Sequence, residues 1–312
     1  MTDIATVSSQ AAAPDVSSTP APGGPRPLPS SGGGEARRER LERLAGRVVL
    51  GVGIFAALFV VYEFAITPLI EQNAQASLLA LFQQTIKTTT LDAPGASPDE
   101  GSPVALIGIP SIGLTQVVIE GTTPSDLKTG PGHLMDTPLP GEAGNVVIAG
   151  RRTTYGGPFA NLDELARGDI VKFDTGQGAV TYIVNTVEHV GAGATDPVLD
   201  TPDNRLTLVT SDPAYLASGR LVVEASLQGR PLDVASRRPV LVGTADLGLT
   251  GDPLGLALGV VWAELLGLTV YLAWRYRHRW SPEVLYLLAA PVVLILAVLT
   301  FSSLDLMLPG TF

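Results

Sequence analysis

Residues 206–213 of the chain read Leu-Thr-Leu-Val-Thr-Ser-Asp-Pro, and residues 220–223 read Arg-Leu-Val-Val. Both runs are dominated by β-branched and aliphatic residues, which is typical of strands, and the glycine between them favours a turn. Ser211 stands in the first run and Arg220 opens the second. The pattern therefore predicts a pair of strands that carries a hydroxyl and a guanidinium near its turn.

The same alternation of short apolar runs and turn residues extends over residues 104–229. Roughly seven or eight strands in about 125 residues suggest a small closed barrel or a sandwich. One short helical piece is expected at residues 159–165. The expected strands are residues 104–109, 116–120, 145–149, 170–174, 179–189, 205–210 and 221–227.

A second motif lies upstream, where residues 145–156 read Asn-Val-Val-Ile-Ala-Gly-Arg-Arg-Thr-Thr-Tyr-Gly. Together with residues 206–213 and 220–223, it resembles the active-site strands of sortases of the class E or actinobacterial type, which are membrane-anchored cysteine transpeptidases of Gram-positive bacteria. The resemblance implies a mostly β fold, a closed sortase-type β-barrel of seven to eight strands with short helices. Further ordered matches to the family are residues 109–114, 118–121, 127–133, 140–145, 153–159 and 165–169.

The resemblance also implies where the chemistry would lie. In sortases a cysteine thiolate attacks the Thr–Gly carbonyl of an LPxTG-type sorting signal, a histidine protonates the leaving amine, and an arginine steadies the oxyanion or the bound signal. Here Ser211 stands at the cysteine position, Arg151 at the histidine position and Arg220 at the arginine position. A serine needs a positioned base to attack an amide, and a guanidinium stays protonated. These three candidate site residues suit the binding of a carbonyl or carboxylate oxygen and lack an evident proton acceptor.

Other candidates for the missing base are poorly placed in the sequence. His133 belongs to a separate segment of the family pattern, and we expect it to make a structural hydrogen bond. His189 ends an expected strand and should face a loop. Asp212 follows the candidate nucleophile and therefore points to the opposite face of the strand. Asp196 and Asp203, in the loop before that strand, stay open as alternatives.

Composition excludes several classes of function. The 312 residues include no cysteine and only three histidines, which rules out disulfides and thiolate catalysis, so we expect neither a metal nor a cofactor. The segment from Glu71 to Asp252 holds 21 acidic and 11 basic residues and carries all of the net charge of −10. Such a domain repels phosphate backbones, so no nucleic-acid partner is expected. Arg152 is expected to balance nearby carboxylates.

Three long apolar runs predict three transmembrane helices, because about 20 apolar residues span a bilayer core. Arginines precede the first run and fill the loop between the second and third, which predicts a plasma-membrane protein with a cytoplasmic N-terminus and an extracellular barrel. A hydrophobic hairpin packed on a soluble domain is the alternative. The expected parts are a disordered cytoplasmic tail (1–47), a transmembrane helix (48–70), a juxtamembrane helix and linker (71–103), the barrel (104–229), a linker (230–252), a transmembrane helix (253–274), a basic cytoplasmic loop (275–283), a transmembrane helix (284–304) and an extracellular tail (305–312).

Two carboxylates and one tail motif need separate interpretations. Glu63 is expected near the outer interface in contact with water, whereas Glu264 is more central in its run and is accommodated by helix packing, protonation or a functional role. Residues 308–312 read Leu-Pro-Gly-Thr-Phe, which resembles LPxT without the following glycine. We interpret this match as chance. The alternative is a pseudo-substrate that caps a neighbouring groove.

Three hypotheses for function follow. The first is a catalytically inactive sortase homologue that binds sorting-signal peptides, surface proteins such as pilins, or another sortase. The second is a serine-based acyltransferase or hydrolase that uses Ser211 on LPxTG- or LAxTG-like peptides. The third is a structural, membrane-tethered barrel whose former site is unused. The sequence leans towards the first, because two of the three positions that carry sortase chemistry are changed.

Overall fold

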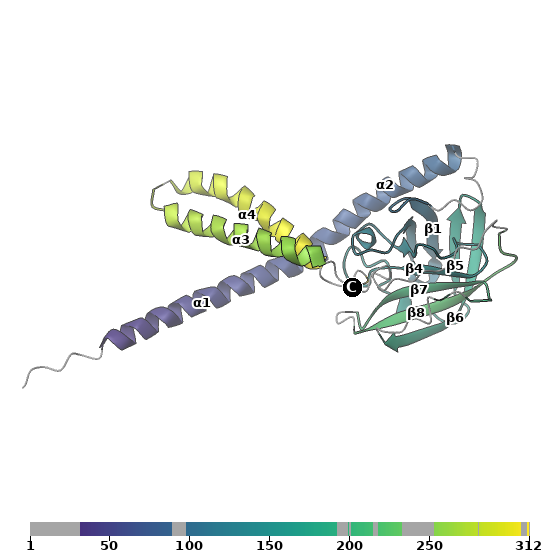
Figure 1. The fold of residues 1–312 in the computed structure, drawn as a ribbon, viewed down its shortest axis with the longest axis horizontal. Helices are drawn as coiled ribbons and strands as arrows, with labels where there is room; N and C mark the ends of the chain where they lie inside the picture. The colour runs from purple at the N-terminus through teal and green to yellow at the C-terminus, as the bar shows by residue number, and fades with distance from the viewer. Residues whose placement is uncertain are drawn as a thin grey trace, which may run out of the picture. The chain divides into compact units, whose positions relative to one another are not determined.

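The computed structural model describes residues 32–88, 98–191, 199, 201–214, 218–232, 253–279, 281–306 and 311. Eight strands form a closed barrel in the order β1-β2-β3-β4-β7-β8-β6-β5, which confirms the predicted fold class. Figure 1 shows the barrel as the sheet-rich part of the chain. The strands are β1 (Pro103–Ile109), β2 (Leu114–Glu120), β3 (Gly132–His133), β4 (Asn145–Ala149), β5 (Ile170–Thr175), β6 (Gly178–Gly191), β7 (Arg205–Asp212) and β8 (Gly219–Leu227).

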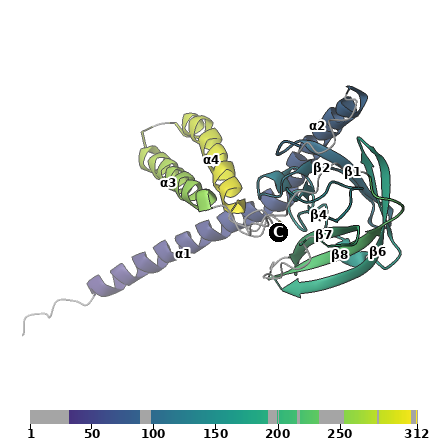
Figure 2. The same ribbon diagram turned by 45° about the vertical axis from the view of Figure 1, so that its right-hand side comes forward.

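Most neighbouring strands of the barrel are antiparallel. The β2–β3 and β4–β7 pairs are parallel, and β4 lies beside β7 although long stretches of sequence separate them. Pairing of β1 with β5 closes the barrel, so each described strand has a neighbour on both sides. Figure 2 shows β7 and β8 side by side in the barrel. The parallel β4–β7 pair brings the two sequence motifs of the candidate site together.

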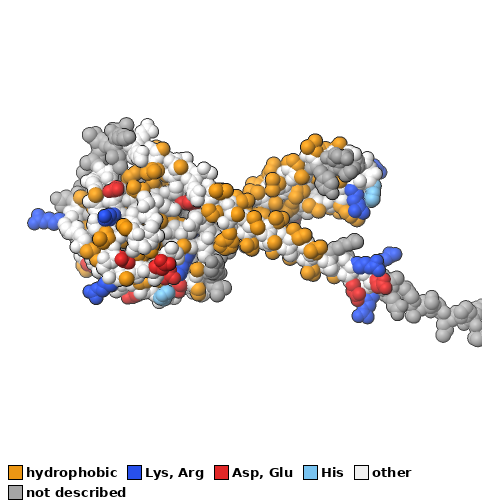
Figure 3. Space-filling view, turned by 180° about the vertical axis from the view of Figure 1, so that it is seen from behind, with side chains coloured by type: hydrophobic (Ala, Val, Ile, Leu, Met, Phe, Trp, Pro, Cys, Tyr) orange, Lys and Arg blue, Asp and Glu red, His pale blue; other side chains and the backbone are white. Residues whose placement is uncertain are grey.

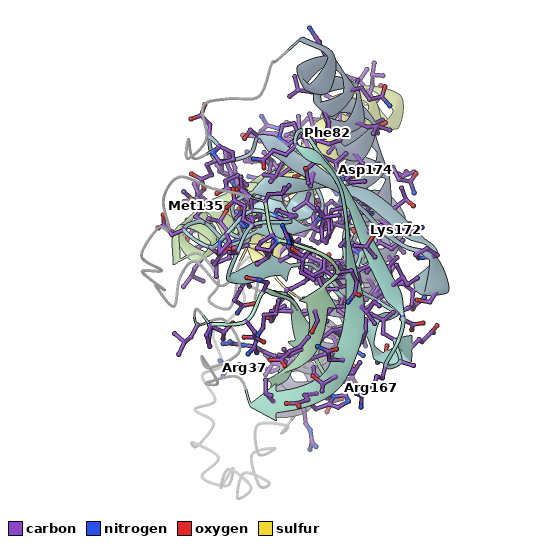
Figure 4. All side chains as sticks on the ribbon, turned by 90° about the vertical axis from the view of Figure 1, so that its right-hand side faces the viewer. Arg37, Phe82, Met135, Arg167, Lys172 and Asp174 are labelled. Carbon is purple, nitrogen blue, oxygen red and sulfur yellow. The ribbon has the colours of Figure 1, made fainter. Side chains whose placement is uncertain are left out.

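The barrel interior is filled by the alternate residues of each strand, as the period of two requires. On β5, Val171 and Phe173 are buried, whereas Lys172 and Asp174 point outward (Figure 4). The ring of Tyr182 packs edge-on against Phe173, and its hydroxyl accepts a hydrogen bond of 2.8 Å from the backbone of Gly141. Burial raises the pKa of Tyr182 to about 12, so this hydroxyl stays neutral in the core.

Three short 3-10 helices, η2 (Pro110–Ile112), η3 (Asp126–Lys128) and η4 (Leu162–Glu164), lie between the strands. The helix expected at residues 159–165 is therefore the single turn η4. Its Leu162 belongs to the barrel core, together with Phe159 and Leu165.

The N-terminal helices are continuous, unlike the separate segments that the sequence predicted. Helix α1 (Gly32–Val61), a π-helical turn η1 (Tyr62–Ile66) and α2 (Thr67–Thr88) follow one another without a break. The helix begins upstream of the expected start at residue 48, because the arginine-rich segment consists of good helix formers. Its paired charges, Arg38 with Glu42 at 3.1 Å and Arg43 with Glu39 at 2.9 Å, follow the helical i,i+4 spacing. The rest of the expected tail, residues 1–31, lies outside the described residues.

Helix α2 packs on the barrel through a half-buried glutamine. The side chain of Gln75 donates to the carbonyls of Val117 at 3.0 Å and Thr129 at 2.8 Å, and accepts from the backbone N–H of Val117 at 2.7 Å. The hydroxyl of Thr67 accepts a hydrogen bond of 3.0 Å from the backbone of Tyr155. Helix α2 is therefore bound to the outside of the barrel.

The last two helices, α3 (Pro253–Tyr276) and α4 (Pro282–Asp305), lie side by side as a hairpin (Figures 1 and 2). Phe301 of α4 contacts the rings of Phe55, Phe59 and Tyr62 at centroid distances of 5.0, 5.4 and 5.6 Å. Residues 55–312 form one compact unit. This aromatic cluster therefore joins the end of the hairpin to the helix that packs on the barrel.

Three helical segments are long and apolar enough to cross a membrane: Val49–Gln84, Gly255–Tyr276 and Leu287–Asp305. Apolar side chains cover the helices in Figure 3, whereas acidic side chains are spread over the barrel. The first segment has 36 residues. At 1.5 Å per residue it is about 54 Å long, which exceeds a bilayer core of about 30 Å and leaves part of it for contacts with the barrel.

The two carboxylates within the apolar runs differ in burial. Glu264 is exposed on α3. Glu63 lies in η1 and is only 4% exposed, so the expectation that it contacts water is wrong. The π-helical turn changes the helix face there and places Tyr62 and Glu63 side by side in buried positions.

Candidate functional site

Ser211 and Arg220 stand directly opposite each other on β7 and β8. Directly paired residues have their side chains on the same face of the sheet. Leu208 points into the core, and Ser211 lies an odd number of positions further along the strand, so Ser211 points to the outer face of the barrel. Both residues are nevertheless buried, with exposed fractions of 1% and 5%. This burial lowers the pKa of Arg220.

The group that lies on Ser211 is a peptide carbonyl of the same chain. The hydroxyl of Ser211 donates a hydrogen bond of 2.8 Å to the carbonyl oxygen of Thr311. The backbone N–H of Arg152 donates to the same oxygen at 3.1 Å. Two donors at such distances on one carbonyl oxygen are the arrangement that holds an oxyanion in acyl-transfer sites. The position of the candidate nucleophile therefore binds a peptide carbonyl.

Arg151 is fully buried and makes its bonds elsewhere. One terminal nitrogen donates to the hydroxyl of Thr154 at 2.8 Å and to the carboxylate of Asp305 at 3.1 Å, and the other donates to the carbonyl of Pro124 at 3.1 Å. The guanidinium also lies over the ring of Tyr155, 4.7 Å from its centroid. These contacts neutralise and immobilise a charge that would be costly to bury alone.

Asp305 is shared between two cations. It lies at the end of α4 with no exposed surface, and its carboxylate pairs with Lys128 at 2.9 Å as well as with Arg151 at 3.1 Å. Burial and the neighbouring carboxylate raise the pKa of Tyr155, so its hydroxyl stays protonated beside the pair. The end of the third apolar helix thus docks on the residue that stands at the histidine position.

Arg152 binds the last two residues of β7. It donates to the carbonyl of Ser211 at 2.9 Å and to the carboxylate of Asp212 at 2.8 Å, and it pairs with Asp163 at 3.0 Å. The prediction that Arg152 balances nearby carboxylates is confirmed. Burial would raise the pKa of Asp212, but the hydrogen bonds from His189 and Arg152 outweigh it and hold that pKa below its usual range.

No described residue supplies a base to Ser211. His133 is bound to Glu120 at 2.8 Å and to the carbonyl of Pro138 at 2.9 Å, which is the structural hydrogen bonding expected for it. His189 bonds to Asp212 at 2.9 Å, and strand alternation places Asp212 on the face opposite Ser211.

Among the described residues, the loop aspartates provide no base for Ser211. Hydrogen bonds from Arg205 hold the pKa of Asp203 below its usual range. This pair lies at the start of β7, about 20 Å of strand away from Ser211. The second loop candidate, Asp196, lies outside the described residues.

Close backbone contacts set the position of the segment that carries the two arginines. A Cβ added at Gly150 would lie 2.6 Å from the ring of Phe159, so only glycine permits this approach at the end of β4. Gly156 has a φ of +74°, and a Cβ there would lie 2.8 Å from the carboxylate of Glu71 on α2. The barrel core and α2 therefore hold this segment from both sides.

Comparison with known proteins agrees with the fold. Residues 107–228 match the family model described as the sortase domain. The chain contains a sortase domain. Sortase SrtE1 of Streptomyces coelicolor is 27% identical over 197 residues, which cover 58% of this chain and 55% of that protein. The chain therefore spans about half of the length of this curated relative. Sortase SrtE2 of the same organism is 28% identical over 223 residues, which cover 62% of this chain and 87% of that protein.

Among solved structures, sortase E of Streptomyces avermitilis is 32% identical, with a TM-score of 0.40, and the similarity covers 43% of this chain and 93% of that one. The two Streptomyces coelicolor relatives, SrtE1 and SrtE2, agree with the class E resemblance of the sequence motifs. The helices α3 and α4 lie outside the residues that match the sortase domain.

The motifs alone do not identify several residues of this candidate site. Lys128, Tyr155 and Thr154 surround Arg151 but match no catalytic position of the family pattern.

The sequence assigns Asp305 to an extracellular tail, although it is the only carboxylate at the end of an otherwise apolar run. This isolated charge is a sequence signal for an ion pair. Its partner Arg151 is evident only from the tertiary structure, in which the barrel and α4 lie together.

Proposed function

We propose that this sortase-family protein binds sorting-signal-like peptides at the outer face of the plasma membrane without cleaving them. The observation that carries the proposal is the hydrogen bond of 2.8 Å from the Ser211 hydroxyl to the carbonyl oxygen of Thr311. The serine hydroxyl acts here as a donor to a peptide carbonyl, with the N–H of Arg152 as a second donor. A pair of donors arranged in this way recognises a peptide through a backbone carbonyl.

The absence of a base among the described residues supports binding rather than cleavage. Attack on an amide requires that the serine lose its proton to an acceptor within hydrogen-bond reach. Arg151, at the position where the family has histidine, is a cation whose hydrogen bonds go to Thr154, Pro124 and Asp305. It neither accepts a proton nor releases one to a leaving amine at neutral pH.

The proposed location follows from the three apolar helices and the arginines beside them. The basic residues precede α1's apolar part and lie between α3 and α4, which favours the cytoplasm for both. The barrel then lies outside the cell, where surface proteins or another sortase present sorting signals. Membrane anchoring keeps the groove close to such partners.

A second candidate, a serine-based acyltransferase or hydrolase, is favoured by one feature of the same site. Two donors converge on the Thr311 carbonyl oxygen at 2.8 and 3.1 Å, as they would on the oxyanion of a tetrahedral intermediate. This candidate requires a proton acceptor from outside the described residues.

The test uses the intact chain in lipid nanodiscs with LPxTG- and LAxTG-type peptides. Peptide mass and intact protein mass are followed together, and binding is measured by fluorescence anisotropy against a scrambled peptide. The variants are Ser211→Ala and the double variant Arg151→His with Ser211→Cys. We expect the native chain to give saturable binding, no cleavage and no adduct, and the double variant to form an acyl adduct.

Two outcomes would contradict the proposal. Cleavage by the native chain that disappears in Ser211→Ala would establish the serine enzyme. A lack of saturable peptide binding in every variant would favour the structural barrel.

A further inference from the structure

Described residues between Phe301 and Thr311 make a series of contacts along the candidate site. The hydroxyl of Tyr62 bonds to that of Ser302 at 2.8 Å, and the ammonium of Lys128 donates to the carbonyl of Ser302 at 3.4 Å. Asp305 follows one helical turn later with its two cations. Thr311 then lies on Ser211.

The residues of this segment that contact the candidate positions Arg151 and Ser211 are buried. Asp305 has no exposed surface, and Thr311 is 1% exposed. Ser211 and Arg220, which point to the outer face of the barrel, are buried as well. An outer-face residue becomes inaccessible only when another part of the molecule covers it, and Thr311 contacts Ser211 directly.

The sequence around Thr311 has the form that a sortase groove is built to accept. Residues 308–311 read Leu-Pro-Gly-Thr, so the threonine whose carbonyl lies on Ser211 occupies the fourth position of an LPxT pattern. In that pattern the threonine carbonyl is the group that the family nucleophile attacks. The sequence pattern and the contact of Thr311 together favour the alternative interpretation of this motif, a pseudo-substrate, over chance.

Ser211 and Arg151, the two positions that differ from the sortase motif, both donate hydrogen bonds to this part of the chain. Ser211, at the cysteine position, donates to Thr311, and Arg151, at the histidine position, donates to Asp305. A hydroxyl donates to a carbonyl oxygen more strongly than a thiol does, and a guanidinium pairs with a carboxylate through fixed donors. The residues that remove the transpeptidase chemistry are thus the residues that hold the chain's own segment.

We infer that Thr311 acts as an intramolecular pseudo-substrate at Ser211, and that the pairs of Asp305 with Arg151 and Lys128 hold the end of α4 beside this site. The site at Ser211 is then closed to other peptides until Thr311 leaves it. An external sorting signal competes for the same carbonyl site. This inference rests on the proposed function for the identity of the competing peptide, but the occupancy of the groove by Thr311 is tested independently of it.

The absence of cysteine from the chain allows a direct test. In Ser211→Cys the new thiol is the only one, and its alkylation by a maleimide reports access to the groove. The rate is compared between the full chain and a chain ending at residue 306, both in lipid nanodiscs. We expect alkylation to be about tenfold faster or more in the shorter chain, because the contacts that close the site are lost.

Two single-cysteine controls separate opening of the groove from unfolding. Thr207→Cys lies on the same strand and face as Ser211 and is fully buried, so its alkylation should stay slow in both lengths. Thr186→Cys is exposed on β6 and should react quickly in both. Equal rates for Ser211→Cys in the two lengths, with Thr207→Cys slow, would overturn the inference.

A second measurement needs no truncation. In the full chain, Ser211→Cys with Thr311→Cys should form a disulfide under mild oxidation, read as intact mass before and after reduction. The matched pair Thr207→Cys with Thr311→Cys should not. A lack of cross-linking in the first pair would contradict the inference even if the shorter chain fails to fold.

Added peptides distinguish this inference from the proposed function. A synthetic Leu-Pro-Gly-Thr-Phe peptide should restore protection of Ser211→Cys in the shorter chain, and failure to do so would count against the pseudo-substrate. If this peptide protects but LPxTG- and LAxTG-type peptides do not, the pseudo-substrate stands and the proposed recognition of sorting signals is wrong.

Discussion

At the scale of single residues, Arg151 has a structural role in this fold. Its guanidinium is buried and pairs with Asp305 at 3.1 Å, while Lys128 shares the same carboxylate at 2.9 Å. Removing one partner of a buried ion pair costs several kcal/mol, whereas removing both partners costs less than the sum of the two single changes. The pair should therefore show strong coupling.

This coupling is measurable by a double-mutant cycle. We expect Asp305→Asn to destabilise the chain by about 3–5 kcal/mol, because it leaves Arg151 without its carboxylate. Adding Arg151→Met should recover about 1–3 kcal/mol of that loss. Chemical unfolding of the full chain in detergent, followed by circular dichroism, gives the free energies. Lys172→Met, at an exposed position, is the control and should change stability by less than about 0.5 kcal/mol. Additive effects of Asp305→Asn and Arg151→Met would contradict the direct pairing.

A second prediction concerns the pH dependence that Asp212 confers. Its pKa is lower in the folded chain than in the unfolded one, because His189 and Arg152 bond to the carboxylate. Its contribution to stability is therefore present above about pH 4 and is lost as the pH falls through the lowered pKa. Asp212→Asn should lower stability at pH 6 by about 1–2 kcal/mol and flatten the acid side of the profile of melting temperature against pH. If the fall of the melting temperature at low pH were unchanged in Asp212→Asn, other carboxylates would account for it.

At the scale of elements, the attachment of α2 to the barrel depends on Gln75. Its side-chain amide makes three hydrogen bonds with the backbone of Val117 and Thr129, at distances of 2.7 to 3.0 Å. The same helix carries Thr67 and Glu71, which approach the segment that holds Arg151. The position of the candidate site therefore depends on a helix outside the barrel.

Replacing this glutamine should loosen the attachment. We expect Gln75→Ala to cost about 2–4 kcal/mol, because buried backbone groups of Val117 and Thr129 lose their partners. Gln72→Ala, at an exposed position of the same helix, should leave stability unchanged. Hydrogen exchange of α2 and of residues 151–157 should rise together in the first variant. Faster exchange in α2 alone would show that the helix does not hold the arginine segment.

At the scale of the whole molecule, we predict that the barrel lies outside the cell and that the turn between α3 and α4 lies in the cytoplasm. Thr186→Cys lies on the barrel, and His278→Cys lies in the basic turn between α3 and α4. In intact cells a membrane-impermeant maleimide should label the first and not the second, since arginine-rich loops stay in the cytoplasm. Both should be labelled after permeabilisation. The opposite labelling pattern would reverse the proposed topology, and labelling of both in intact cells would contradict the spanning hairpin.

The strands and apolar helices could be predicted because their signals are local. Short runs of β-branched and aliphatic residues predicted β5, β7 and β8, and the lengths of the apolar runs predicted α3 and α4. The continuity of α1 with α2 could not be predicted in the same way. Contacts between Gln75 and the barrel stabilise α2, and those partners are more than 40 positions away in the sequence.

The sequence by itself determined the fold of this protein, the position of its sortase domain, and Ser211 and Arg151 as candidate site residues. These conclusions follow from short patterns, in which neighbouring residues carry the information. Only the tertiary structure decided what these two residues bind. Their partners, Thr311 and Asp305, lie 100 and 154 positions away, and hydrogen bonds over such separations form only when the barrel and α4 come together.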